Sequence, residues 1–192
     1  MLKNQVQYPI SAQMNFIFRA RMLWRDLATW LRAYKVSLYG GVGNSESLSQ
    51  RLYQIPLEYG NMLRVFVGDE ATEKYINLLS QYIILLQSLF IAQINNDVNS
   101  IDDLTKQIYQ NTKERAALFA QMNPYWSQSE WITLMNAFTQ MQIEEATTFL
   151  TQDYDRNIEI FDRILSLTTI MGDYFSEGLT FFFMLNPYGS QN

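Results

Sequence analysis

A short helical pattern occurs three times in the chain at a constant interval. It reads LSQRLYQ from Leu48, LTKQIYQ from Leu104 and IFDRILS from Ile160. Consecutive copies therefore start 56 residues apart (104 less 48, and 160 less 104). A repeat of this length indicates one supersecondary unit, which cannot bury its apolar face alone and packs against its copies. The repeat predicts three helical hairpins around a shared interior, starting near Leu23, Leu78 and Leu134.

Glycine and proline divide the chain into helices. Gly40, Gly41 and Gly43 are typical of a helix end, Pro56 of a restart, and Gly68 of a stop. No segment alternates with period two for long enough to predict a strand. Short connections favour antiparallel neighbours, so the predicted fold class is all-α: an up-and-down helical bundle of three repeated hairpins with a ferritin-like appearance. The predicted helices cover about residues 12–39, 45–54, 56–66, 70–95, 101–121, 128–151 and 154–184.

Polar residues at the helix starts predict where each helix begins. Their side chains can accept hydrogen bonds from free amides of the first turn. Two pairs also have the spacing of a capping box or resemble one, Ser127 with Glu130 and Ser100 with Asp103. The other predicted caps are Ser11, Asn44 or Ser45, Asp69 and Asp153.

Composition predicts one globular domain. Hydrophobic residues make up 48% of the chain and charged residues 17%, which suits a protein with a sizeable core. No interdomain linker is visible, so we expect a single helical-bundle domain over 11–185, a flexible N-terminal arm over 1–10 and a flexible tail over 186–192.

Charge and apolar patterning limit the partners. The net charge of −5 argues against nucleic acid, and the arginines of the first helix (Arg19, Arg21, Arg25 and Arg32) are interpreted as a solvated face. The N-terminus lacks the apolar segment of a signal peptide. The apolar runs from Ile83 and from Leu179 are shorter than the roughly 20 residues of a membrane span. We therefore expect a soluble, cytoplasmic protein that does not bind membranes.

The chain contains no His and no Cys, which removes the usual chemistry of many enzymes. The commonest general base and metal ligand is missing, and so is every His-based triad. We predict no catalytic residue, no metal ligand and no cofactor. Carboxylates could still hold a metal: Glu144 and Glu145 are expected to face solvent, while Asp26 borders the inward Leu27 and is the most interesting acid.

Two further features have a functional and a structural interpretation. The loop Gly40-Gly-Val-Gly-Asn-Ser45 follows a helix and lacks the lysine of a phosphate loop, so it is interpreted as a helix end. The 9 Met, 12 Phe, 12 Tyr and 4 Trp residues could line a pocket for an apolar ligand, but a well-filled core is the favoured interpretation.

Three blocks carry a resemblance to a known family. They read NPYWSQSEW from Asn123, YDRNIEIFDRI from Tyr154 and MGDYFSEG from Met171. Together with RLYQIP and LRVFVGDEA they resemble a family of small bacterial all-helical proteins of unassigned function, common in spore-forming bacteria. The likeness extends from about Leu23 to Gly178.

The resemblance implies an ancestral site. Family members carry a His in each hairpin, at the positions that are Leu27, Tyr82 and Phe138 here. Three converging His would suggest a metal or proton-handling site, as in ferritin-like relatives. Because this chain has apolar or phenolic side chains there, the resemblance implies that the site has been converted to core.

Three functions are compatible with these observations. The preferred one is a non-catalytic structural or interaction role for an uncharacterised bacterial helical bundle, with a possible homodimer and an unknown protein partner. The first alternative is a ferritin-like metal-binding protein or oxidoreductase that uses carboxylates and Tyr82. The second is a binder of a small apolar ligand in the bundle interior, near Leu27, Asp26, Tyr82 and Phe138.

Overall fold

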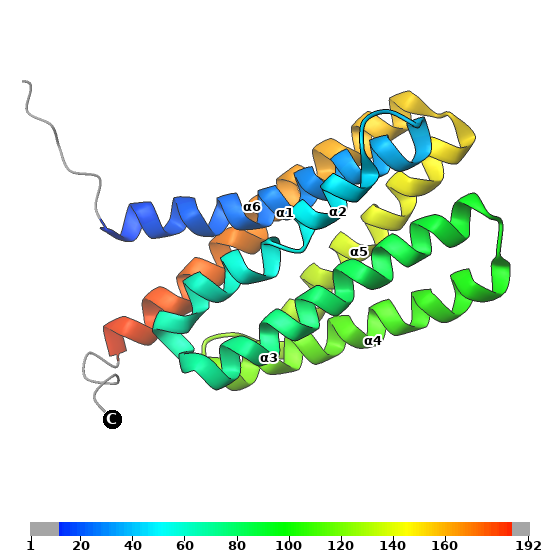
Figure 1. The fold of residues 1–192 in the computed structure, drawn as a ribbon. Coiled ribbons are helices and arrows are strands. Elements are labelled where there is room, and N and C mark those ends of the chain that lie inside the picture. The colour runs from blue at the N-terminus through cyan, green and yellow to red at the C-terminus, as the bar shows by residue number, and fades with distance from the viewer. Residues whose placement is uncertain (1–11, 186–192) are drawn as a thin grey trace, which may run out of the picture.

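The computed structural model describes residues 12–185, which form helices joined by short connections and contain no strand. The arm predicted at 1–10 and the tail predicted at 186–192 lie outside the described residues. The all-α class is confirmed. The helices are α1 (Ala12–Gly40), α2 (Ser45–Leu52), α3 (Ile55–Ile94), α4 (Val98–Met122), α5 (Gln128–Thr151) and α6 (Tyr154–Leu185) (Figure 1).

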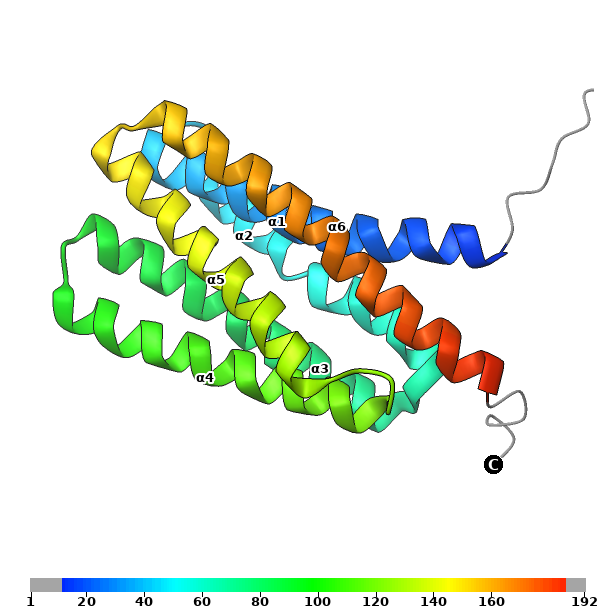
Figure 2. The ribbon, with the colours of Figure 1, turned by 180° about the vertical axis from the view of Figure 1, so that it is seen from behind.

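The helices form an elongated bundle in which successive long segments run in opposite directions (Figures 1 and 2). Most helices pack against their neighbours in the sequence, as α3 does against α4 and α5 against α6. The exception is α1, which packs extensively against α6. The first and last helices of the described chain therefore pack together, and the bundle closes into a ring of helices.

Gly68 divides α3 into two parts. Its φ of 77° and ψ of 178° lie in a region that only glycine adopts readily, and Figure 1 shows α3 turning sharply along its length. The helices predicted at 56–66 and 70–95 are thus joined at Gly68 rather than separated by a loop. Thr72 stabilises the turn, because its hydroxyl donates to the Gly68 carbonyl at 2.6 Å.

Side-chain caps begin several helices. Asn44, Ser127 and Asp153 accept hydrogen bonds from the amides of Ser47, Glu130 and Arg156, which confirms these predicted caps. The predicted pair Ser100 and Asp103 is wrong. Asp97 caps α4 instead, accepting from the Ser100 amide at 3.1 Å, so the helix begins three residues earlier, at Val98. An aspartate caps a helix about as well as a serine does. Asp97 also lies at the turn between α3 and α4.

Aromatic side chains fill one end of the core. Trp131 contacts Trp24, Phe119 and Trp126, with ring centroids 5.7, 4.7 and 6.0 Å apart, and Trp126 stacks on Phe175 at 5.1 Å. All five side chains are buried. Such offset and edge contacts stabilise a core beyond simple area burial. The aromatic residues around the break at Asn123-Pro124 therefore pack the end of the bundle.

The buried face of α6 differs from the prediction in its first turns. The apolar spacing of three and four residues along 154–184 predicts that Ile158 faces inward, but it is 56% exposed, whereas Asn157 and Ile160 are buried. Two hydrogen bonds of the Asn157 side chain cause this difference. Its amide donates to Thr148 Oγ1 at 2.8 Å and to the Glu145 backbone carbonyl at 3.3 Å. These bonds orient the helix, and Ile158 then points to solvent.

Helices α1 and α6 approach closely at Gly172. A Cβ atom there would lie 2.6 Å from the Arg21 Cα, so no larger residue fits without displacing the backbone. Next to it, the Arg21 guanidinium donates to both carboxylate oxygens of Asp173, at 2.5 and 2.9 Å. The prediction of one solvated arginine face is therefore wrong for Arg21 and Arg32, which both pair with acids, while Arg19 and Arg25 are exposed.

Candidate functional site

The three positions of the implied ancestral site all lie in the core. Leu27 and Tyr82 are fully buried and Phe138 is 2% exposed. The Tyr82 hydroxyl shares a hydrogen bond of 2.9 Å with Thr139, which connects α3 to α5 beside Phe138. Asp26 is separate from these three, because it is half-buried and lines a surface groove.

A buried arginine lies against Tyr82. The Arg115 guanidinium is 4.0 Å from the centroid of the Tyr82 ring, and its Nε donates to Asn111 Oδ1 at 2.9 Å. Arg115 is 2% exposed and forms no ion pair with a carboxylate of residues 12–185. The ring face and the amide oxygen stabilise its charge instead. Burial raises the pKa values of Tyr59, Tyr75 and Tyr82, so these phenols stay neutral.

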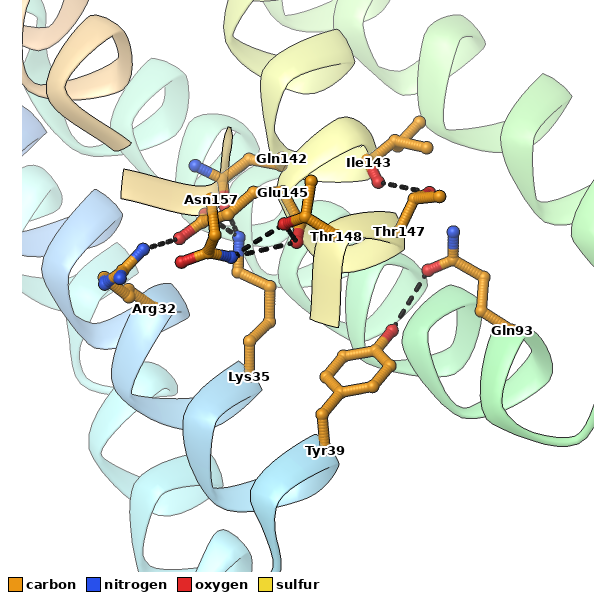
Figure 3. A network of polar contacts seen from close by, with 10 residues as sticks. All are labelled: Arg32, Lys35, Tyr39, Gln93, Gln142, Ile143, Glu145, Thr147, Thr148 and Asn157. Atoms are coloured by element: carbon orange, nitrogen blue, oxygen red, sulfur yellow. Dashed lines mark hydrogen bonds and ion pairs between the residues drawn. The ribbon is translucent and has the colours of Figure 1, made fainter. Parts of the chain in front are cut away.

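A second polar network crosses the bundle between α1, α5 and α6 (Figure 3). Lys35 and Glu145, both 0% exposed, form an ion pair, and Arg32 also donates to Glu145. The Lys35 ammonium further donates to Gln142 Oε1 at 2.8 Å and lies 5.4 Å from the Phe90 ring centroid. Burial lowers the pKa of Lys35, and the Glu145 charge opposes that shift.

The network corrects the expectation that Glu145 faces solvent. Glu144, its neighbour, is partly exposed, whereas Glu145 is fully buried between two cations. The structure also adds Lys35 and Arg115, which sequence reasoning missed. A signal was present for Lys35, because it lies next to the buried Tyr34 on the inward face of α1. Removing one partner of such a pair leaves an uncompensated buried charge, so each side chain depends on the other.

An open groove lies between the first half of α1 and the first part of α3. Its volume is about 710 Å³, and Asp26 lies at one end of its lining. Several lining side chains are apolar and exposed to solvent, with exposed fractions of 49% for Phe18, 53% for Met22 and 74% for Val65. The groove also contains Arg19, an exposed cation. The groove is therefore largely apolar, with one charge of each sign on α1 and a second acid, Glu58, on α3, which pairs with Arg51.

The described residues offer no obvious metal centre. Within residues 12–185 no three side chains of the His, Cys, Asp or Glu type cluster closely enough to hold a metal ion. In the same range the buried acid Glu145 is already occupied by two cations.

One helical stretch has a composition that bears on membranes. The segment Ser45–Ile94 is long and apolar enough to cross a bilayer, although its separate apolar runs are short. More than half of its most apolar window, 56%, is buried inside the bundle. Core helices of bundles have the same composition, so its apolar character is explained by packing.

Comparison with known proteins assigns no function to these side chains, so their role is inferred from the geometry. No known protein family, curated protein or solved structure matches the chain.

Proposed function

We propose that the protein is a non-catalytic interaction module, whose groove between α1 and α3 binds an amphipathic helix of a partner. The observation that carries the proposal is the exposed apolar lining, with Phe18, Met22 and Val65 about half or more exposed. Exposed apolar patches on a soluble protein mark sites of interaction. An amphipathic helix would insert apolar residues spaced three and four apart, which is a recurring mode of peptide recognition.

The energy of such binding is moderate. Burying a Phe, Met or Val side chain fully contributes roughly 1.5–3 kcal/mol. About half of Phe18 and of Met22 and about three quarters of Val65 remain to be buried, so these residues supply on the order of 3–5 kcal/mol. Association costs an estimated 4–15 kcal/mol in lost freedom. The partner must therefore add apolar contacts of its own, and micromolar rather than nanomolar affinity is expected.

Binding of a labelled helical peptide tests the proposal. The probe is an 18-residue idealised helix with one leucine stripe and mixed Lys and Glu elsewhere, followed by fluorescence anisotropy. The native protein should bind it, and Val65→Asp should weaken binding at least about tenfold. The control is Ile84→Asp, which introduces the same charge at an exposed position of the same helix. Equal effects of the two substitutions, or no binding at protein concentrations where the native chain is monomeric, would refute the proposal.

A small apolar ligand is the second candidate occupant. The groove volume of about 710 Å³ lies within the 300–1,000 Å³ typical of ligand pockets. This candidate differs from the predicted one, since the ligand would bind at the surface rather than near Leu27 and Phe138. Native mass spectrometry of protein purified from cells would reveal a co-purified apolar compound, and an uncomplexed mass would argue against it.

The first alternative predicted from the sequence, a ferritin-like metal protein or oxidoreductase, has no supporting cluster of ligands within residues 12–185. Elemental analysis for Fe, Mn and Zn remains its direct test. The family resemblance, the equivalence of three copied hairpins and the cytoplasmic location are likewise proposals. Burial of Leu27, Tyr82 and Phe138 at repeat-related positions supports the copied hairpins. An experimental structure in which the three segments fail to superpose would contradict them.

A further inference from the structure

The face of α1 that lines the groove is complementary to itself. Arg19 and Asp26 both lie on this face, seven residues or two helical turns apart, which is about 10.5 Å along the axis. The midpoint between them falls between Met22 and Leu23, which also line the groove. A second α1 laid antiparallel on this face would therefore bring each Arg19 opposite an Asp26, with Met22 and Leu23 near the twofold axis.

Neither charge is neutralised within the described part of the chain. Among residues 12–185, Arg19 and Asp26 form no ion pair, whereas Arg21 and Arg32 on the same helix both pair with acids of α5 or α6. The apolar Met22 between them is 53% exposed. A self-complementary patch with apolar centre and charged ends is what an isologous dimer requires.

We infer that the helix bound in the groove is α1 of a second copy of this chain, packed antiparallel about a twofold axis near Met22. The inference rests on the proposed function and names its partner. Each copy buries its Phe18 and Met22 against the other, and Val65 covers the edge of the paired helices. The two Arg19–Asp26 contacts form at the ends of the interface, where they select the antiparallel orientation.

Cysteine cross-linking tests the position of the axis. The chain contains no Cys, so Met22→Cys introduces a single thiol. Under mild oxidation this variant should form a disulfide-linked dimer rapidly, because residues near a twofold axis face their own copies. The control is Ile84→Cys, which is 48% exposed on α3 away from the groove. Equal rates for the two variants would overturn the inference.

Charge exchange tests the orientation. Arg19→Glu and Asp26→Arg should each raise the dimer dissociation constant at least about tenfold, because both ends of the symmetric interface then carry like charges. An equimolar mixture of the two variants should associate again, and so should the double variant. Sedimentation equilibrium measures all four samples at low salt. Failure of the mixture to associate would overturn the antiparallel arrangement.

The outcomes separate the two proposals. A native protein that stays monomeric at all concentrations, yet binds the idealised peptide in a Val65-dependent way, refutes the dimer and leaves a different partner for the groove. A native protein that neither dimerises nor binds the peptide refutes both. A ligand or a terminal segment of the same chain in the groove would produce a monomer and would also overturn the dimer.

Discussion

The Lys35–Glu145 pair allows the sharpest prediction about stability. Both side chains are fully buried, and Glu145 is the only carboxylate within ion-pair distance of Lys35 in the described residues. Replacing Glu145 by Gln leaves the Lys35 ammonium with Gln142 and the Phe90 ring as its remaining partners. A buried charge that loses its counterion is strongly destabilising, by about 3–5 kcal/mol.

The reverse substitution should cost less. In Lys35→Met the Glu145 carboxylate keeps its contact with Arg32, so the loss is about 1–3 kcal/mol, as for one unsatisfied buried acceptor. In the double variant Lys35→Met/Glu145→Leu both buried charges disappear, and Arg32, whose side chain is 22% exposed, can turn to solvent. The double variant should therefore be more stable than Glu145→Gln alone, by about 2 kcal/mol or more.

Urea unfolding followed by circular dichroism measures these free energies, with the slope checked for equality between variants. A pH series adds an independent readout. Burial lowers the pKa of Lys35, so below the ordinary value near 10.5 the unfolded chain binds more protons than the folded one. Stability should rise with pH in that interval, and Lys35→Met should lack this rise. A cost below about 1 kcal/mol for Glu145→Gln, or a double variant no more stable than Glu145→Gln, would refute the reasoning.

Three other predictions concern the core and the helix contacts. Phe138→Ala should destabilise the protein by about 3–5 kcal/mol, measured by the same unfolding assay; a cost below about 1 kcal/mol would place the side chain outside the core. Gly172→Ala should lower Tm by several degrees, since the new methyl group meets the Arg21 backbone; an unchanged Tm would contradict the close approach. Stability should fall steeply above about pH 10, because burial raises the pKa values of Tyr59 and Tyr82 and the unfolded chain loses those protons first. A free energy of unfolding that stays constant above about pH 10 would contradict this.

The helices could be predicted because their signals are local. Asn44, Ser127 and Asp153 act through amides three residues away, and glycine or proline marks most of the breaks. Which face of a helix is buried depends on residues farther away in the sequence. Ile158 was assigned to the core from spacing alone, but the hydrogen bonds of Asn157 to α5 decided the orientation of α6.

The polar sites depend on distant residues and could not be predicted. Lys35 and Glu145 are 110 positions apart, so nothing near either residue reveals its partner. Asp26 was selected as an interesting acid because it borders Leu27, and it does line the groove. The groove itself arises from the angle between α1 and α3, which no spacing in the sequence encodes.

The packing of α1 against α6 has a consequence for synthesis. A ribosome releases α1 first, and the surface that will contact α6 stays uncovered until more than a hundred further residues have emerged, since Arg21 and Asp173 are 152 positions apart. During that time the nascent chain exposes apolar surface on its leading helix. Chaperones that recognise such surface should therefore engage α1 early, and release it only when the last helix arrives.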